Sequence, residues 1–364
     1  MNPSQGLVDA LTYMKNASVK EGRLYHQFVP DVDLTTSISD FGSPILDPQN
    51  TNVLNDFIAL LKKVVYTAVN TRLFNNPLAQ LEGERLPLGQ FIENAYANPS
   101  KARKFDVNDH MGLLQKYEAE LAVEYLSVNS DLQYSVTITR DKIRNAFTSW
   151  RNLEEMITGL TNTLYNGAYL NHYNMTKALV TGSYVGDRIN IVQVADPTDE
   201  ATAKAMITQM RATFSKMRVP STKFNGWNKI NAGDDTKPVL KTWSDPEDIV
   251  VMISADVDAL TSVEVLARAF NMSETDFLGK VIVVDDFNQY NDDGTVAVDG
   301  SHIKALIADK AFFKIREQDF DMSDFWNPSN RTWNLYLNDV RMYNTSMFAN
   351  AVVFADELPT PPTP

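Results

Sequence analysis

A long stretch of helical periodicity in the middle of the chain limits what this sequence can fold into. From Ser149 onward, apolar residues recur at the spacing of one helix face: Leu153, Ile157, Leu160, Leu164, Ala168, Met175 and Leu179. About 31 residues at 1.5 Å each predict a helix roughly 46 Å long over residues 149–180. Its other faces carry Asn, Thr and Tyr instead of Glu and Lys. Because a solvated helix face is usually charged, this composition favours contact with other protein, and an ordinary core helix is the alternative.

The chain before this helix changes character near residue 51. Residues 1–50 mix Pro, Ser, Asp, Asn and Gln with isolated apolar residues and show no sustained period, which predicts an irregular arm or a set of loops. A helix is then predicted from Asn52 to about Thr71, because apolar residues return at helical steps. Further on, residues 133–139 alternate between apolar and polar side chains and predict a strand.

The segment after Gly182 alternates between strand and helix patterns, which is typical of an α/β lobe. The predicted strands cover residues 187–194, 248–253 and 280–284, and the predicted helices cover 196–217 and 257–270. Three more apolar segments predict strands toward the end of the chain, at residues 303–315, 332–337 and 349–354.

Charge and residue usage exclude several classes of function. The chain of 364 residues has 33 Lys plus Arg against 46 Asp plus Glu, a formal net charge of −13, whereas a dedicated nucleic-acid binder needs a basic surface to neutralise phosphates. There are no cysteines, which excludes disulfides, thiolate metal sites and cysteine nucleophiles. We see no leader with a basic start and an apolar run, and no apolar stretch long enough to span a bilayer, so we expect a soluble intracellular protein.

One pair of acidic residues is the best lead to enzymatic chemistry. Asp285 and Asp286 directly follow the apolar segment 281–284, and α/β enzymes often place metal-binding or acid–base carboxylates at the end of a strand. The alternative is that Asp285 and Asp286 lie in a solvated turn that leads to the Asn-Asp-Asp-Gly turn at 291–294. A calcium-binding EF-hand loop built around Gly294 is not predicted, because its last position would be Gly300, which supplies no bidentate carboxylate. Glycine-rich phosphate-binding motifs and the serine and zinc hydrolase motifs are absent from the sequence. We therefore predict no catalytic, cofactor-binding or metal site.

The order of these pieces resembles the major capsid proteins of tailed bacteriophages, which have the Hong Kong 97-like fold. Several strings look like those of the small podovirus (picovirus) group in particular. They are NPL at 76–78, VTITRDKIRNAF at 136–147, IKALIADKAFF at 303–313, FWNPSNRTWNLY at 325–336 and FANAVVF at 348–354. This resemblance implies an α+β fold in which an N-terminal arm, an extended loop and a long spine helix accompany a peripheral and an axial domain.

The resemblance assigns each part of the chain to a domain. Residues 1–50 would be the N-terminal arm, 80–135 the extended loop, 190–318 the axial domain and 359–364 a flexible tail. The peripheral domain would combine residues 51–79, 136–189 and 319–358, with the spine helix at 149–180. Some relatives carry an additional C-terminal immunoglobulin-like domain, which we expect to be missing here. Because such an arm has no core of its own, deletion of residues 1–50 should leave a folded subunit that forms no stable shell.

The same resemblance implies a function. The chain would be a major capsid protein that self-assembles, as hexamers and pentamers, into an icosahedral head enclosing double-stranded DNA in the virion. The implied partners are scaffolding and portal proteins, and decoration proteins are left open. DNA would be enclosed without sequence-specific binding, and no membrane would be involved. Assembly would take place in the host bacterial cytoplasm. Neither a cofactor nor enzymatic activity is expected. The alternatives are another self-assembling protein, such as an encapsulin-type shell, a tail protein or a surface-layer protein, and an α/β metal-dependent hydrolase that uses Asp285 and Asp286.

Overall fold

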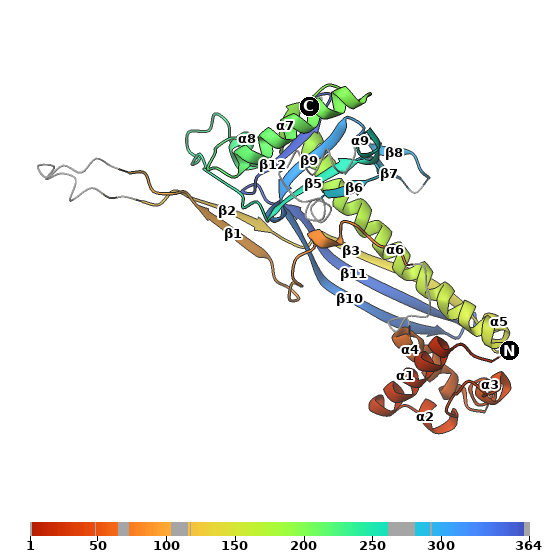
Figure 1. Cartoon of the computed structure of the whole chain (residues 1–364). Coiled ribbons are helices and arrows are strands. Elements are labelled where there is room, and N and C mark those ends of the chain that lie inside the picture. Colours follow the sequence, from red (N-terminus) through yellow and green to blue (C-terminus); the bar gives the residue numbers. More distant parts are fainter. Residues whose placement is uncertain are drawn as a thin grey trace, which may run out of the picture. The chain divides into compact units, whose positions relative to one another are not determined.

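The computed structural model describes residues 2–47, 49–64, 73–102, 116, 118–260, 281–291 and 293–359, which form helices together with parallel and antiparallel strands (Figure 1). The chain divides into two compact units. The first comprises Met1–Asn76, Ser130–His172 and Asp319–Val340, and the second comprises Pro77–Asn129, Tyr173–Gln318 and Arg341–Pro364. The predicted α+β class is confirmed.

The first unit begins with helices, where an irregular arm was predicted. They are α1 (Gln5–Glu21), α2 (Tyr25–Phe28), α3 (Ile38–Leu46) and α4 (Thr51–Val64). Ser4 Oγ accepts a hydrogen bond from the main-chain N–H of Leu7 at the start of α1, and Gly22, at a φ of 64°, ends that helix. The prediction for residues 1–50 is therefore wrong. Caps and turns interrupt the helices, so no single period extends over the whole segment.

These helices also have a core, contrary to the expectation for an arm. The side chains of Leu7 and Met14 on α1 are fully buried. The ring centroid of Phe57 on α4 lies 6.4 Å from that of Phe41 on α3 and 5.4 Å from that of Phe147, within the range in which aromatic pairs stabilise a core beyond the area they bury. The predicted helix from Asn52 is confirmed at its start, and its predicted end lies outside the described residues.

A single helix of 36 residues, α6 (Trp150–Val185), follows the short α5 (Arg140–Ala146). It confirms the long helix predicted from its period. Its residues through His172 belong to the first unit, where its apolar face packs into the same core as the N-terminal helices, and its later residues belong to the second unit. None of the described helices, α6 included, is both long and apolar enough to cross a membrane.

A three-stranded sheet accompanies α6. Its order is β10 (Phe313–Asn327), β11 (Thr332–Thr345) and β3 (Ser130–Thr139). In the first unit, the hydroxyl of Thr137 on β3 donates a hydrogen bond of 2.8 Å to the side-chain carbonyl of Asn334 on β11. The strands predicted at 133–139 and 332–337 are thereby confirmed.

A five-stranded sheet forms the centre of the second unit, in the order β4, β12, β9, β5, β6. The strands are β4 (Asn190–Gln193), β5 (Ile249–Ser254), β6 (Val281–Val284), β9 (Ile303–Asp309) and β12 (Ala351–Ala355). β4 is parallel to β12 and β5 is parallel to β6, whereas β9 runs antiparallel to both of its neighbours. β4, β6 and β9 lie within segments predicted to be strands, and β5 and β12 extend one residue past the predicted ends at 253 and 354. The α/β character of this part of the chain is confirmed.

Both faces of this sheet are covered, because alternate residues of a strand point to opposite sides. Val251 of β5 belongs to the core beneath α7 (Glu200–Met217), whereas Met252 belongs to the core that contains Val180 of α6. The start of α7 is fixed by a capping box between Asp199 and Thr202, as expected for the helix predicted at 196–217. Of the helix predicted at 257–270, α9 (Ala255–Leu260) is described and residues 261–270 lie outside the described residues.

The remaining elements of the second unit are short. Two antiparallel pairs join β1 (Ile92–Ala97) to β2 (Leu121–Leu126) and β7 (Gln289–Tyr290) to β8 (Val296–Val298). The described residues also form the helix α8 (Gly226–Ile230) and 3₁₀ turns at Ala79–Leu81 and Lys310–Phe312. The second of these turns interrupts the strand predicted at 303–315. Of the tail predicted at 359–364, residues 360–364 lie outside the described residues.

Candidate assembly interface

The two-stranded ribbon formed by β1 and β2 has two different faces (Figure 1). Its register places Ala95 opposite Val123 and Ala97 opposite Leu121. In an antiparallel pair, directly opposite residues point to the same face and their neighbours point to the other face. Burial alternates accordingly along both strands. The ribbon therefore has an inner face, which packs on the rest of the second unit, and an outer face.

The inner face is held by aromatic and polar contacts. The ring centroid of Tyr96 lies 6.1 Å from that of Phe348, which lies 5.4 Å from that of Trp227. The hydroxyl of Tyr96 donates a hydrogen bond to the main-chain carbonyl of Lys241, and partial burial raises the pKa of this phenol. One residue beyond β1, Asn98 Oδ1 accepts a hydrogen bond of 2.9 Å from the main-chain N–H of Lys241. These contacts fix the ribbon to the loop before β5.

A buried carboxylate adds to this attachment. Glu124 of β2 is 9% exposed. Its Oε1 accepts hydrogen bonds from the side chains of Asn94 and Ser346, and its Oε2 accepts one of 2.9 Å from the main-chain N–H of Met347. A buried carboxylate is costly unless its oxygens are hydrogen-bonded. These partners therefore determine that the face carrying Glu124 is the one that packs on the rest of the second unit.

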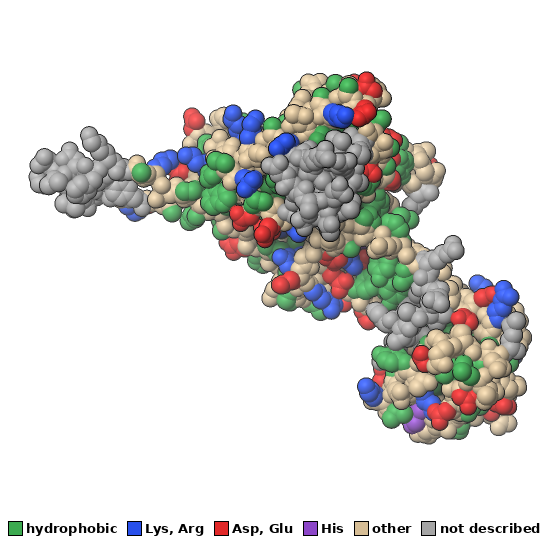
Figure 2. Space-filling view, in the orientation of Figure 1, with side chains coloured by type: hydrophobic (Ala, Val, Ile, Leu, Met, Phe, Trp, Pro, Cys, Tyr) green, Lys and Arg blue, Asp and Glu red, His purple; other side chains and the backbone are tan. Residues whose placement is uncertain are grey.

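The outer face of the ribbon is exposed and mostly apolar, with Glu93 as a charged residue that accepts a hydrogen bond of 3.3 Å from the hydroxyl of Tyr125. Leu121, Val123 and Tyr125 have 59%, 38% and 67% of their surface exposed, and Phe91, one residue before β1, has 62% exposed. The rings of Phe91 and Tyr125 lie side by side, with their centroids 6.4 Å apart, and Figure 2 shows hydrophobic side chains over this part of the surface. Contiguous exposed apolar side chains mark surfaces that bind other molecules. This face can therefore bury itself on an apolar surface of a second molecule.

Asp285 and Asp286, the acidic pair found in the sequence, are the partners of a buried lysine. Lys177 of α6 is 1% exposed, and its ammonium nitrogen lies 2.6 Å from Asp285 Oδ1 and 3.2 Å from Asp286 Oδ1. The hydroxyl of Tyr173 donates a second hydrogen bond of 2.6 Å to Asp285 Oδ1, and that of Tyr290 donates one to Asp286. A buried ammonium group needs such partners, because an unpaired one would be strongly destabilising.

The protonation of this pair follows from its contacts. Burial alone would raise the pKa of Asp285, but hydrogen bonds from Lys177 and Tyr173 outweigh burial and hold this pKa below its ordinary value. Burial, together with the hydrogen bond to Asp285, raises the pKa of Tyr173. A carboxylate of lowered pKa is a weak base, which makes Asp285 poorly suited to general-base catalysis. Within the described ranges, no three His, Asp or Glu side chains are arranged to hold a metal ion.

Asp285 and Asp286 could be singled out in the sequence, but their partner Lys177 was missed. Lys177 lies within the helical pattern, far from the pair in sequence, but it shares a helix face with Tyr173, Val180 and Tyr184, all of which are buried. A lysine on an apolar helix face is a signal for a buried acidic partner. The outer face of the ribbon was also missed, since apolar residues occur on both faces of 121–126 and only the register shows which ones are exposed.

Known proteins are similar to this chain along nearly its whole length. A family model described as Phi29-like phage major capsid protein matches residues 15–355. The major capsid protein of Bacillus phage PZA is 28% identical over 354 residues, which cover 96% of this chain and 74% of the relative. That of Bacillus phage B103 is 29% identical over 356 residues, with the same two coverages. Among solved structures, a chain of the capsid of Staphylococcus phage Andhra shares the fold, with a TM-score of 0.62 and 14% identity over 80% of this chain and 88% of that chain.

Proposed function

Because the chain belongs to the Phi29-like phage major capsid protein family and so forms the shell of a phage capsid, we propose that its copies, arranged as hexamers and pentamers, close into an icosahedral head around double-stranded DNA. The observation that carries the proposal is the outer face of the ribbon. Leu121, Val123 and Tyr125 form an apolar surface that one copy leaves exposed, and a neighbouring copy provides what covers it. Obligate assemblies commonly bury more than roughly 2,000 Å² at each interface, and repeated contacts between unlike surfaces close into symmetric shells.

We assign the domains as the family resemblance suggests, with one revision. The extended loop is residues 80–135, which include the ribbon; the axial domain is 190–318, which supplies four strands of the five-stranded sheet; and the tail is 359–364. The peripheral domain is 51–79, 136–189 and 319–358, with the spine helix at 149–180. Residues 1–50 remain the N-terminal part of the subunit, but they act as packed helices instead of an arm that folds only on a neighbour.

The proposed partners follow from the same role. Scaffolding and portal proteins would guide closure in the bacterial host cytoplasm. The net charge of −13 supports a container that confines DNA by its geometry and does not grip phosphates. We also propose that the chain has no enzymatic activity, since the ion pairs of Lys177 engage both aspartates of the candidate catalytic pair.

Electron microscopy of the purified chain tests the shell. Angular closed particles are expected, and tubes or flat lattices would contradict an icosahedral head. A separate measurement tests the absence of catalysis. The purified shells are tested for hydrolysis of phosphate esters and of peptides. The chain is also an enzyme if the shells have such an activity and the double variant Asp285→Asn with Asp286→Asn loses it while shells still form.

A further inference from the structure

We propose that neighbouring copies are joined in a ring by a contact between the β7–β8 hairpin of one copy and a pocket beside β4 of the next. The proposal rests on the shell-forming function above and names residues for one of its contacts. Both surfaces belong to the second unit of the chain.

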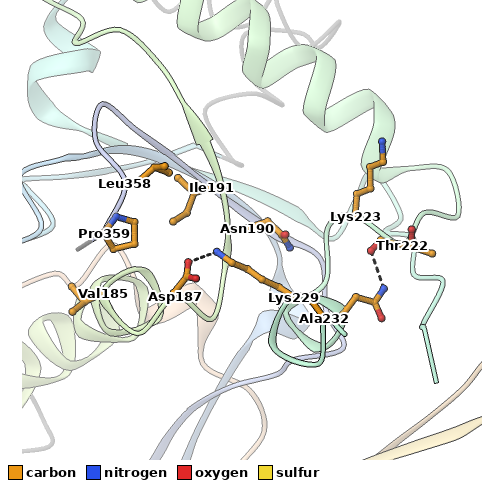
Figure 3. A pocket seen from close by; sticks show the side chains of 11 residues that line it. Val185, Asp187, Asn190, Ile191, Thr222, Lys223, Lys229, Ala232, Leu358 and Pro359 are labelled. Carbon is orange, nitrogen blue, oxygen red and sulfur yellow. Dashed lines mark hydrogen bonds and ion pairs between the residues drawn. The ribbon is translucent and has the colours of Figure 1, made fainter. Parts of the chain in front are cut away.

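The pocket has an apolar side and a positive charge. It has a volume of about 650 Å³. As Figure 3 shows, Val185, Ile191 and Leu358 lie along one side, and Lys223 lies across from them. Val185 and Leu358 are 36% and 58% exposed, so the pocket leaves apolar surface in contact with water.

Of the two lysines that line the pocket, only one is available to a partner. The ammonium group of Lys229 is bound to the carboxylate of Asp187 and to the main-chain carbonyl of Ile189. Lys223 is exposed, and no ion pair joins it to another residue in the ranges that the structure covers. An acidic group entering the pocket would therefore meet one uncompensated positive charge.

The pocket also borders the open edge of a sheet. β4 is the end strand, with β12 on one side only. Just after β4, the main-chain N–H of Val194 donates to the carbonyl of Ala355 on β12. Along a strand, the main-chain N–H and C=O of every second residue point to the same neighbour. Those of Val192 and Asn190 therefore also point toward β12, and those of Ile191 point away from it. The main-chain N–H and C=O of Ile191 are thus directed away from β12, where they can pair with an incoming extended segment.

The β7–β8 hairpin has the complementary features. Tyr290 and Val296 face each other across the two strands and are 46% and 50% exposed. The turn between them carries Asp293, which is exposed, and hydrogen bonds from Thr295 lower the pKa of its carboxyl group, so that it is negative at neutral pH. The described residues of the hairpin therefore present the exposed side chains of Tyr290 and Val296 next to the negative charge of Asp293. The pocket has an apolar side and the positive charge of Lys223.

The positions of the two surfaces explain why the occupant is a second copy. The pocket lies beside β4, whereas the hairpin follows β6, and these are the two opposite end strands of one five-stranded sheet. Four strand spacings of about 4.8 Å place the two edges roughly 19 Å apart. A ring about a rotation axis requires each subunit to present two different surfaces that fit each other on opposite sides.

The absence of cysteine from the sequence permits a direct test in assembled shells. The variant with both Lys223→Cys and Asp293→Cys, oxidised after assembly, should give a ladder up to pentamers and hexamers on a non-reducing gel. The matched control carries Lys20→Cys with Asp293→Cys, which replaces an exposed lysine of the first unit, and should give no such ladder. Melting of the unassembled variants, compared with the original chain, establishes that they fold.

Charge reversal gives a second test that needs no cross-link. Lys223→Asp or Asp293→Lys alone should lower the yield of closed shells at least about tenfold, because like charges then meet at the contact. The two reversals together should restore the yield. If the original chain forms shells but the cysteine pair gives no ladder and the double reversal does not restore assembly, the contact is wrong while the shell-forming function stands. If the original chain forms no shells, both fail together.

Discussion

The buried ammonium group of Lys177 on α6 lies 2.6 Å from the carboxylate Oδ1 of Asp285, directly beyond β6. Within the second unit, this ion pair ties the long helix to the end of an outer strand of the five-stranded sheet. Asp286 accepts from the same ammonium group at 3.2 Å. The pair that suggested catalysis in the sequence is therefore a structural connection between two elements.

Removing both carboxylates should destabilise the subunit. In the chain with Asp285→Asn and Asp286→Asn, Lys177 would remain buried without a negative partner, and we expect the free energy of unfolding to fall by roughly 3 kcal/mol. Urea denaturation of the unassembled subunit measures this. Asp31→Asn, which breaks an ion pair at a side chain that is 94% exposed, should change it by less than about 1 kcal/mol. Equal effects of the two changes would contradict a structural role for the pair.

The same carboxylate should make stability depend on acid pH. The pKa of Asp285 is lowered in the folded chain, so between this pKa and the unfolded value of about 3.9 the unfolded chain binds more protons. The stabilisation is then complete above about pH 4 and is lost as the pH falls through the lowered folded pKa. As the pH is lowered, the free energy of unfolding should therefore fall less steeply for Asp285→Asn than for the original chain. Parallel curves would show that Asp285 does not contribute.

Truncating the aromatic core of the first unit should be costly. Phe57 is fully buried among Phe41, Phe147 and other rings, so Phe57→Ala should lower the free energy of unfolding by about 3–5 kcal/mol. The matched change Phe28→Ala removes a ring that is 46% exposed, and a small effect is expected. Thermal denaturation of both variants provides the comparison, and a ranking in the opposite order would contradict the packing described.

Deleting residues 1–50 should unfold part of the subunit, in contrast to what an irregular arm would do. The deletion removes α1, α2 and α3 and leaves Phe57 of α4, together with Phe147 and Trp150, without their cover. Limited proteolysis should then cut within 51–64 and 140–160, while the second unit remains protected. If the truncated chain resists proteolysis as well as the original does, residues 1–50 are an arm that the rest of the subunit does not need in order to fold.

A charge on the outer face of the ribbon should block assembly without unfolding the subunit. Val123 lies in the middle of this face, and Val123→Asp would place a carboxylate where a neighbouring copy buries apolar surface. We expect the concentration needed for shells to rise at least about tenfold, with nearly unchanged subunit stability. Glu93→Gln on the same face, opposite Tyr125, is the control and should still assemble. Light scattering against protein concentration measures both.

Two kinds of element could be predicted from the sequence: long elements with a continuous period, and the buried strands of the five-stranded sheet, which are short apolar runs. The 36 residues of α6 repeat one apolar face, and β3 and β11 alternate over many residues. On α1, Leu7, Leu11 and Met14 do keep helical spacing before Gly22 ends the helix. This helix was missed because the polar caps and turns between α1, α2 and α3 break any period over residues 1–50 as a whole.

The candidate surfaces depend on contacts between distant segments, which no local pattern encodes. Whether Val123 is exposed or buried depends on which face of the ribbon docks, and this in turn depends on Glu124 meeting Ser346 and Met347. Likewise, Asp285 is a turn residue in the sequence and becomes an ion-pair partner only when α6 packs beside β6. Tertiary packing decides both outcomes.

The strand β12 has a consequence for the timing of chain synthesis. It is the last of the five strands of its sheet to be translated, yet it lies between β4 and β9. Until residues 351–355 have left the ribosome, β4 lacks the strand beside it in the sheet, and Asn190 must wait for Val352, which is made 162 residues later. Such distant pairing folds slowly and late. Only chains translated through β12 contain all five strands, so the order of the strands makes completion of this sheet a late event in the synthesis of the chain.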